Sequence, residues 1–252
     1  VEFRFEEAVK EIRVDNSFAH TVETINGAYL ADVVIAGADY HHVETTLLPT
    51  ASRSYPDSYW DSRLMAPSCL IYYVGLNKKL SGVQHHTLFF DVPFDAHAAE
   101  IYAKPGWPTE PLFYASIPSV TDPSVAPAGH ENLFFLIPVA AGLTGDTEEL
   151  RDRYFHQVIQ RFETHIGQRV TDSIVYKKSF GYTDFLNDYN SFRGNAYGLA
   201  NTLMQTAIFK PSCRSRKVKN LFFTGQLTVP GPGVPPSLIS GEVVAKEVLK
   251  NF

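Results

Sequence analysis

Cysteine is nearly absent from this sequence of 252 residues, since only Cys69 and Cys213 occur. Two cysteines are too few for a disulfide framework, which fits a reducing compartment, and we expect both to be buried thiols. Long hydrophobic runs are also missing. The longest nearly apolar stretch, residues 133–143, is interrupted by Pro138 and is far shorter than the roughly 20 residues of a membrane-spanning helix. The sequence therefore predicts neither a disulfide-stapled fold nor a transmembrane helix.

An excess of positive charge is missing as well. The 22 Lys and Arg residues against 27 Asp and Glu give a net charge of −5, which excludes a basic nucleic-acid-binding surface. A hydrophobic content of 44% excludes a disordered chain. Aromatic residues, in contrast, are abundant, with 18 Phe and 13 Tyr. Composition alone leaves open whether they line an apolar binding cavity or fill an ordinary core.

Several chemical signatures are absent. The chain contains no G-x-G-x-x-G or P-loop motif and no G-x-S-x-G elbow, so neither a complete nucleotide fingerprint nor a nucleophilic serine is predicted. Histidines occur in the adjacent pairs His41-His42 and His85-His86. Adjacent side chains point to different faces of a helix or strand, so we expect no metal site. No catalytic base can be named.

The order of the elements predicts an α/β chain with an insertion. Residues 1–30 have the pattern of a β-meander, and Ala31–Ala36 that of an interior strand, followed by a helix that Asp39 caps. From about residue 50 to 130 the sequence becomes rich in Pro and aromatic residues with short strands. A long helix follows, with Asp146 and Glu149 as a capping box and Gly167 at its end.

The strongest local signal is a strand–loop–helix unit near the C-terminus. An apolar strand at 220–225 is followed by a loop rich in Gly and Pro, and by a helix expected from about Ser237 to Lys250. Bare glycine backbone before a helix N-terminus favours an anionic or electron-rich ligand atom. On spacing alone, a purely structural turn is equally compatible.

The segment Asn220–Gly241 resembles the C-terminal flavin-binding signature of the bacterial-type phytoene desaturases, the FAD-dependent carotenoid desaturases of the flavin amine oxidase-like superfamily. The stretches Glu7–Ile12 and Ala31–Asp39 resemble the second FAD-contacting region of that family. Gly194–Leu199 resembles the small-residue segment before the signature, and Gly129–Pro138 a strand of the substrate domain. The resemblance covers essentially the whole chain.

The resemblance implies cofactor contacts in three places. The backbone near Val9 faces the adenine, with Gly37 and Ala38 close to the nucleotide, while Gly225 and Gln226 lie near the ribityl chain or the pyrophosphate. The helix N-terminus lies under the isoalloxazine, where its dipole would stabilise the negative charge of reduced flavin. The implied residues there are Gly233, Val234, Pro235 and Ser237, the last of which could instead serve as a helix cap.

Small residues are implied to shape the substrate channel. Ala196 and Gly198 leave room beside the flavin ring, and Tyr197 walls the channel or is simply a core aromatic residue. The chain departs from the family where Thr228-Val229-Pro230-Gly231 replaces the common Thr-His-Pro-Gly. This departure indicates a sub-branch with its own substrate, one that acts on hydroxylated or monocyclic carotenes.

The resemblance also predicts the organisation. We expect an incomplete FAD-binding Rossmann-type domain in residues 1–48 and 200–252, with an inserted α+β substrate domain in residues 49–199. The glycine-rich N-terminal half of the Rossmann domain is expected to precede Val1, where the sequence opens within a strand pattern and without Met.

The implied activity is desaturation of a carotenoid: a hydride passes to FAD, a proton leaves the neighbouring carbon, and a C=C bond forms. Oxygen or a quinone would accept the electrons, and a cytoplasmic protein in peripheral contact with membrane lipid would draw its substrate from the bilayer. Two alternatives remain at this point. One is another flavin-dependent reaction, such as amine oxidation or polyene saturation or isomerisation. The other is a non-catalytic fragment that binds an apolar ligand.

Overall fold

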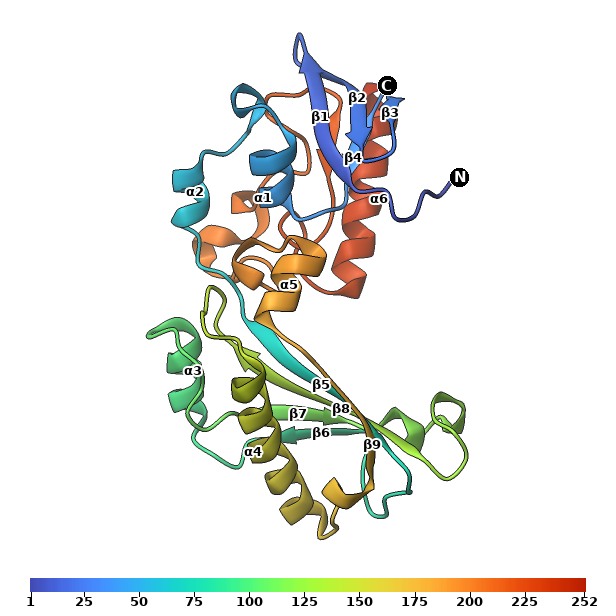
Figure 1. The fold of residues 1–252 in the computed structure, drawn as a ribbon. Helices are drawn as coiled ribbons and strands as arrows, with labels where there is room; N and C mark the ends of the chain where they lie inside the picture. Colours follow the sequence, from blue (N-terminus) through green and yellow to red (C-terminus); the bar gives the residue numbers. More distant parts are fainter. The chain divides into compact units, whose positions relative to one another are not determined.

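The computed structural model describes all residues from Val1 to Phe252, which form two compact units. Unit 1 comprises Val1–Ala66, Asp188–Phe192 and Tyr197–Phe252, and unit 2 comprises Pro67–Asn187 and Arg193–Ala196. Figure 1 traces the chain through both. No helix is both long enough and apolar enough to cross a membrane.

Unit 1 begins with the predicted meander. Strands β1 (Val9–Asp15), β2 (Phe18–Thr24) and β3 (Ala28–Leu30) form an antiparallel sheet in that order. The turn between β1 and β2 places Asn16 and Ser17 at positive φ angles, the conformation of a tight hairpin. The meander expected from the alternating sequence is confirmed.

A two-stranded parallel sheet forms the centre of unit 1. Strand β4 (Val34–Ala36) pairs with β10 (Leu221–Phe223), with Val34 opposite Leu221. The prediction of a strand buried on both faces is wrong at Ile35, which is 51% exposed, because Val34 and Ala36 point to the covered face of the sheet and Ile35 points to the open one. Asp39 caps α1 (Tyr40–His42) as expected, and the helix continues as a π-helical turn at Val43–Leu47.

The buried side chain of Asn220 joins distant parts of unit 1. Its Oδ1 accepts the Ala19 N–H at 2.8 Å, and its Nδ2 donates to the Ala19 carbonyl at 2.6 Å and to the Asp32 carbonyl at 2.8 Å. The amide group of Asn220 thus forms hydrogen bonds, as donor and as acceptor, with two segments that lie about 200 residues away in sequence. This contact fixes β10 against the meander and the start of β4.

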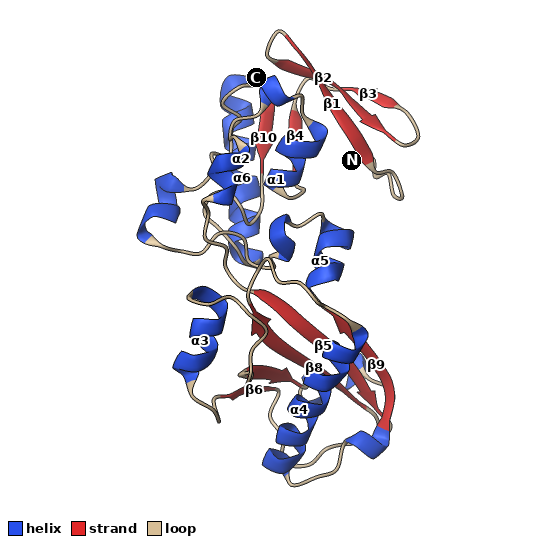
Figure 2. Cartoon of the chain, turned by 60° about the vertical axis from the view of Figure 1, so that its left-hand side comes forward, coloured by secondary structure: helices blue, strands red, loops and turns tan.

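Unit 2 is built on a five-stranded antiparallel sheet with the order β6-β7-β8-β5-β9. The strands are β5 (Ser68–Leu76), β6 (His86–Phe89), β7 (Phe113–Ser116), β8 (Glu131–Val139) and β9 (Ile174–Phe180). Helix α4 (Glu148–Ile166) lies across one face, as Figure 2 shows. Alternate side chains such as Phe135 and Ile137 pack there against Phe155 and Phe162 to form the core.

The start of α4 differs from the predicted capping box. Thr147, rather than Asp146, is the N-cap, because its side chain accepts the Leu150 N–H at 3.2 Å. The Asp146 carboxylate instead receives two hydrogen bonds from Arg151. Gly167 ends the helix in the left-handed conformation, as predicted.

Four further helices complete the chain: α2 (Asp57–Asp61), α3 (Phe94–Tyr102), α5 (Tyr182–Tyr189) and α6 (Val234–Asn251). Helix α6 begins three residues before the predicted Ser237, because Gly233 is the N-cap and Pro235 and Pro236 occupy the first turn, where a helix needs no N–H donors.

Candidate functional site

The two parallel strands of unit 1 end side by side, and two of the predicted cofactor segments begin there. Thr224 after β10 donates its N–H to the carbonyl of Ala36 at the end of β4, at 3.0 Å. A β-carbon on Gly37 would lie 3.6 Å from Thr224 Oγ1. Ligands in α/β folds bind outside the carboxyl ends of parallel strands, so this edge is the natural place for a nucleotide.

A cavity of about 560 Å³ lies beside β4 and brings three predicted residues together. Val9 comes from β1, and Gly37 and Ala38 follow β4. The other walls are mainly aliphatic, including Ile12, Val22 and Val43, with His42 as the single titratable side chain. Burial lowers the pKa of His42, so its imidazole favours the neutral form. An apolar, uncharged cavity of this size suits a flat heteroaromatic ring.

Gly225 has the backbone expected of a residue that a ligand approaches. Its φ is +101°, a value that side chains rarely allow, and no atom lies within 4 Å of the position that a β-carbon would take. Its N–H is held by Ser240 Oγ at 2.9 Å, and Ser240 Oγ in turn donates to the Ser237 carbonyl at 2.7 Å. The buried hydroxyl therefore ties the end of β10 to α6.

Ser240 was not predicted from the sequence. The only signal for it is a small polar residue on the buried side of the last helix, one turn beyond the glycine loop, and serines at such positions are common.

We expect Ser240→Ala to lower the free energy of unfolding by about 1.5 kcal/mol, because the Gly225 N–H loses its partner. Urea denaturation measures the change. Ser237→Ala is the matched control, since the Ser237 side chain makes no such bond and its loss should leave stability within about 0.5 kcal/mol of wild type. Equal losses in the two variants would contradict the role assigned to Ser240.

The N-terminus of α6 offers fewer donors than expected. Pro235 and Pro236 have no N–H, and Ser237 donates its own to the Gly233 carbonyl at 2.9 Å, which leaves Val234 with the available donor of the first turn. The alternative that Ser237 caps the helix is wrong, because Gly233 holds that position. Val234 and Leu238 are exposed, so one N–H sits beside an apolar surface suited to a flat ring.

The three predicted channel residues do not fall in one unit. Ala196 belongs to unit 2, whereas Tyr197 and Gly198 belong to unit 1. At Gly198, φ is +70°, and a β-carbon would lie 2.7 Å from the carbonyl oxygen of Gln226. The absence of a side chain at Gly198 is therefore required by its packing against Gln226, one of the predicted cofactor residues.

The second face of the unit 2 sheet, opposite α4, is rich in aromatic side chains. The ring of Phe134 on β8 lies 5.5 Å from that of Tyr73 on β5 and 6.1 Å from that of Tyr114 on β7. Beside them a cavity of about 280 Å³ lies under α3, lined by apolar groups that include Leu88, Phe94 and Pro138. This combination suits a flat or extended hydrocarbon.

His97 is the only histidine in that cavity wall, and both of its ring nitrogens are used. Nδ1 accepts the Leu112 N–H at 3.0 Å, which makes Nε2 the protonated atom that donates to the Pro138 carbonyl at 2.8 Å. Burial lowers the pKa of His97, while the hydrogen bond to the Pro138 carbonyl and the charge of Glu100 raise it to a smaller extent. The residue therefore fixes α3 to β8 and is not placed to act as a catalytic base.

This geometry predicts a pH effect. Because the pKa of His97 is lower in the folded than in the unfolded state, its contribution to stability is complete above about pH 6.5 and is lost as the pH falls below that value. From pH 7.5 to 5.5, wild type should lose about 1 kcal/mol more stability than His97→Gln, which retains an amide donor and acceptor but does not titrate. Urea denaturation at both pH values tests this. Identical pH dependence would show that His97 protonates freely in the fold.

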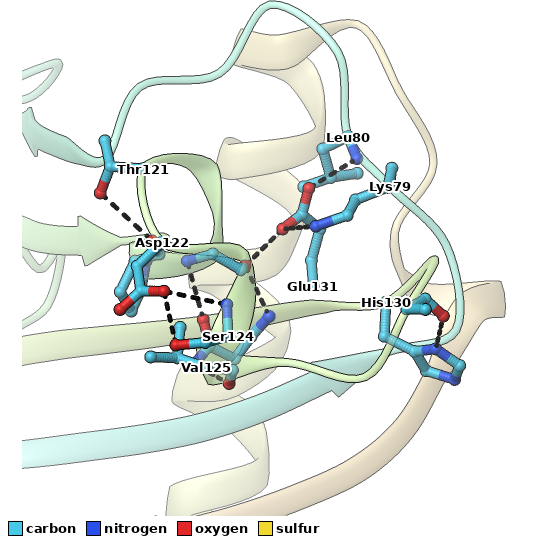
Figure 3. Close-up of polar contacts among 12 residues, drawn as sticks. Lys79, Leu80, Thr121, Asp122, Ser124, Val125, His130 and Glu131 are labelled. Carbon is cyan, nitrogen blue, oxygen red and sulfur yellow. Dashed lines mark hydrogen bonds and ion pairs between the residues drawn. The ribbon is translucent and has the colours of Figure 1, made fainter.

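Glu131, at the start of β8, has a buried carboxylate whose hydrogen-bond partners hold the local structure together (Figure 3). It receives hydrogen bonds from the Ser119 hydroxyl, from Lys79 Nζ at 3.2 Å and from the Leu80 N–H at 3.3 Å. These contacts hold the two neighbouring loops. No group of three His, Cys, Asp or Glu side chains is arranged to hold a metal.

Comparison with known proteins places these features in a family. Residues 1–249 match the family described as flavin containing amine oxidoreductase. The chain is 44% identical to the carotenoid 3,4-desaturase of Haloarcula japonica over 232 residues, which are 92% of this chain and 47% of that protein. It is 28% identical to the phytoene desaturase of Fusarium fujikuroi, covering 100% of this chain and 48% of that protein.

Among solved structures, an oxidoreductase from Methanosarcina mazei has the same fold, with a TM-score of 0.61 and 12% identity. The match covers 95% of this chain and 49% of the other. The chain thus spans about half the length of the curated relatives that it matches. Together with the paired strand ends and the open glycine at Gly225, the match over residues 1–249 shows that the chain belongs to the flavin-containing amine oxidoreductase family.

Proposed function

We propose that this chain is part of an FAD-dependent carotenoid desaturase, an oxidoreductase that acts on CH–CH groups. The observation that carries the proposal is the 44% identity to a carotenoid 3,4-desaturase across 92% of the chain. The aromatic second face of the unit 2 sheet and the apolar cavity beside it support a long hydrocarbon substrate.

Unit 1 fits the cofactor. Val9, Gly37 and Ala38 line one cavity that suits the adenine, and Gly225 leaves open space where the ribityl chain or pyrophosphate would pass. The Val234 N–H beside exposed apolar side chains suits the isoalloxazine. When bound, FAD would supply a hydride acceptor.

We propose that unit 1 is the incomplete part of a Rossmann-type domain. A two-stranded parallel sheet is not stable alone, and the outer edge of β4 has no partner while Ile35 and Leu30 are exposed. Further strands along that edge would pair its free backbone groups, and the helices that connect parallel strands would cover the open face that carries Ile35. Unit 2 would be the substrate domain. Its boundaries lie after Ala66 and before Tyr197, whereas the sequence predicted boundaries after residue 48 and before residue 200.

The chain's own residues would act mainly by positioning. His97, the one histidine in the apolar cavity wall, is fully engaged by backbone groups, so no base is offered there. Loss of hydride from a carbon beside a polyene leaves a delocalised cation whose neighbouring proton is acidic, and the rate would then depend on alignment with the ring more than on a base. Oxygen or a quinone would reoxidise the cofactor.

We also propose that the protein works at the cytoplasmic side of a membrane as a peripheral protein, because a carotenoid dissolves in the bilayer and must be drawn from it.

The test uses protein expressed from its complete reading frame. A visible spectrum with flavin bands, together with conversion of a carotene to a product two hydrogen atoms lighter by mass spectrometry, is expected. Amine substrates should remain unchanged in the same assay. Flavin bands with consumption of the amine and no change in the carotene would overturn the proposed substrate, and absence of flavin would overturn the activity as a whole.

A further inference from the structure

A second pocket in unit 1, of about 560 Å³, is lined by cationic and aromatic side chains. Its walls come from the segment around α2 and from residues 204–216. The charged members are Arg63, Lys210 and Arg216, and no Asp or Glu is among the lining residues. We call these three side chains and the space between them the cationic pocket.

Lys210 is an unusual member because it is 4% exposed and its ammonium has no hydrogen-bond partner. Burial alone lowers its pKa, with no acidic group acting on it. The position of its backbone is fixed, since the Thr228 hydroxyl donates to the neighbouring Pro211 carbonyl at 2.7 Å. Its Nζ lies 3.4 Å from the position that a β-carbon on Gly231 would take, and a buried cation without a counter-ion adds to the positive potential that the pocket presents to an anion.

The two arginines are held in place by tyrosines. The guanidinium carbon of Arg63 lies 4.5 Å from the Tyr59 ring centre, and that of Arg216 lies 4.6 Å from the Tyr55 ring centre. The two rings are themselves 4.5 Å apart. Guanidinium groups stacked in this way present planar donors to an oxyanion such as a phosphate, which they bind in a bidentate manner.

The nearby buried carboxylate of Glu44 does not neutralise the pocket. It accepts the backbone N–H groups of Ser54 and Tyr55, at 2.7 and 3.1 Å, and is not a lining residue. The positive charge of the pocket is therefore available to a ligand.

The rim of the pocket is apolar and exposed. Met204, Ile208 and Phe209 lie on two short 3₁₀ helices, Leu203–Gln205 and Ala207–Phe209, and Ile208 is 88% exposed. Exposed apolar side chains beside clustered cations are typical of segments that lie in the interface of an anionic membrane.

We propose that the cationic pocket binds the phosphate of an anionic phospholipid headgroup while residues 203–209 lie among the lipid chains. This deepens the peripheral membrane contact proposed above and rests on it, but it does not depend on flavin chemistry. A phospholipid fits both features of the site, because its phosphate can bind the cations and its acyl chains can contact the apolar rim. A free phosphate would leave the apolar rim exposed to water.

Co-sedimentation with vesicles tests the proposal, using protein expressed from its complete reading frame. Phosphatidylcholine vesicles containing phosphatidylglycerol should bind the protein more tightly than pure phosphatidylcholine vesicles. Arg63→Gln and Arg216→Gln should each weaken that binding about fivefold. Lys217→Gln removes the same charge next to Arg216 but outside the pocket lining, and should weaken binding less than twofold. If Arg216→Gln and Lys217→Gln weakened vesicle binding equally, the binding would come from general attraction between the positively charged surface and the anionic membrane, and the proposed phosphate site would be wrong.

The apolar rim and the source of the phosphate are tested separately. Ile208→Ser should weaken vesicle binding, whereas Leu249→Ser, an equally exposed position on α6, should not. Inorganic phosphate at constant ionic strength should displace little of the bound protein, and complete displacement with no effect of Ile208→Ser would indicate a free-phosphate site and overturn the lipid assignment.

Flavin content is measured in the same samples. If Arg63→Gln and Arg216→Gln lose flavin and keep wild-type vesicle binding, the cations serve the cofactor and the proposal is wrong. Vesicle binding is independent of turnover, so protein that binds vesicles but does not desaturate a carotene contradicts the proposed function alone.

Discussion

Arg151→Met is expected to lower the free energy of unfolding by about 4 kcal/mol, because it leaves a buried carboxylate without its cation. Arg151 donates Nε and Nη2 to the two oxygens of Asp146, each at 2.6 Å, and its Nη1 reaches Asp184 at 2.7 Å. The side chain of Asp146 is 1% exposed.

The same change should alter the pH dependence. Burial by itself raises the pKa of Asp146, but the hydrogen bonds from Arg151 and from the Thr183 N–H outweigh it and leave the pKa lowered. Without Arg151, burial dominates, the pKa rises, and protonation relieves the variant as the pH falls. The difference in stability between wild type and variant should therefore shrink between pH 7 and pH 5.

Urea denaturation followed by circular dichroism at both pH values measures these effects. Arg153→Met on the same helix is the matched control. Arg153 interacts with the Tyr154 side chain, with its guanidinium carbon 5.8 Å from the ring centre, but pairs with no buried carboxylate, so its loss should cost less than about 1 kcal/mol. A loss at Arg151 no larger than at Arg153 would show that the buried ion pair does not stabilise unit 2.

Gly198→Ala is expected to destabilise unit 1 by about 3 kcal/mol. The left-handed φ of +70° accounts for about 1 kcal/mol, and the β-carbon at 2.7 Å from the Gln226 carbonyl oxygen for the remainder, since backbone cannot move aside as a flexible side chain can. Thermal unfolding and flavin content are the measurements, because displacement of Gln226 would also disturb the neighbouring Gly225.

The variant Gly82→Ala separates the cost of the left-handed backbone conformation from the cost of the steric clash with Gln226. Gly82 has nearly the same φ, +67°, but nothing lies within 4 Å of its would-be β-carbon, so only the strain of about 1 kcal/mol is expected. If Gly198→Ala were no more harmful than Gly82→Ala, the close packing on Gln226 would be too loose to matter.

The sequence was most informative where periodicity and turn chemistry act locally. The meander, the cap at Asp39, the left-handed end of α4 at Gly167 and the strand at 221–223 all follow from short-range patterns, and the structure confirms them. The cap of α4 was misassigned because Asp is the stronger N-cap by type, although Thr147 holds the position in the structure. Only the position of Arg151 decides between them.

Other parts of the site could not be predicted because they depend on tertiary contacts. The bond between Ser240 and Gly225 joins two elements whose spacing shows no motif. The sequence likewise could not show that Lys210 lacks a counter-ion, because Lys210 precedes several other Lys and Arg residues, up to Lys219, and such a stretch has the composition of an ordinary solvated loop. The exposed Ile35 shows the limit of strand patterns, which report β-branched composition but not whether both faces of the strand are covered.

The bonds of Asn220 to Ala19 and Asp32 have a consequence for synthesis on the ribosome. Strand β10 is made about 190 residues after β4, its partner in the parallel sheet, which is a delay on the order of 10–40 seconds at ordinary elongation rates. Unit 2 is almost continuous in sequence and can fold within that delay. Strand β4 must therefore wait for β10, so unit 1 reaches its final pairing only after the sheet of unit 2 has been synthesised.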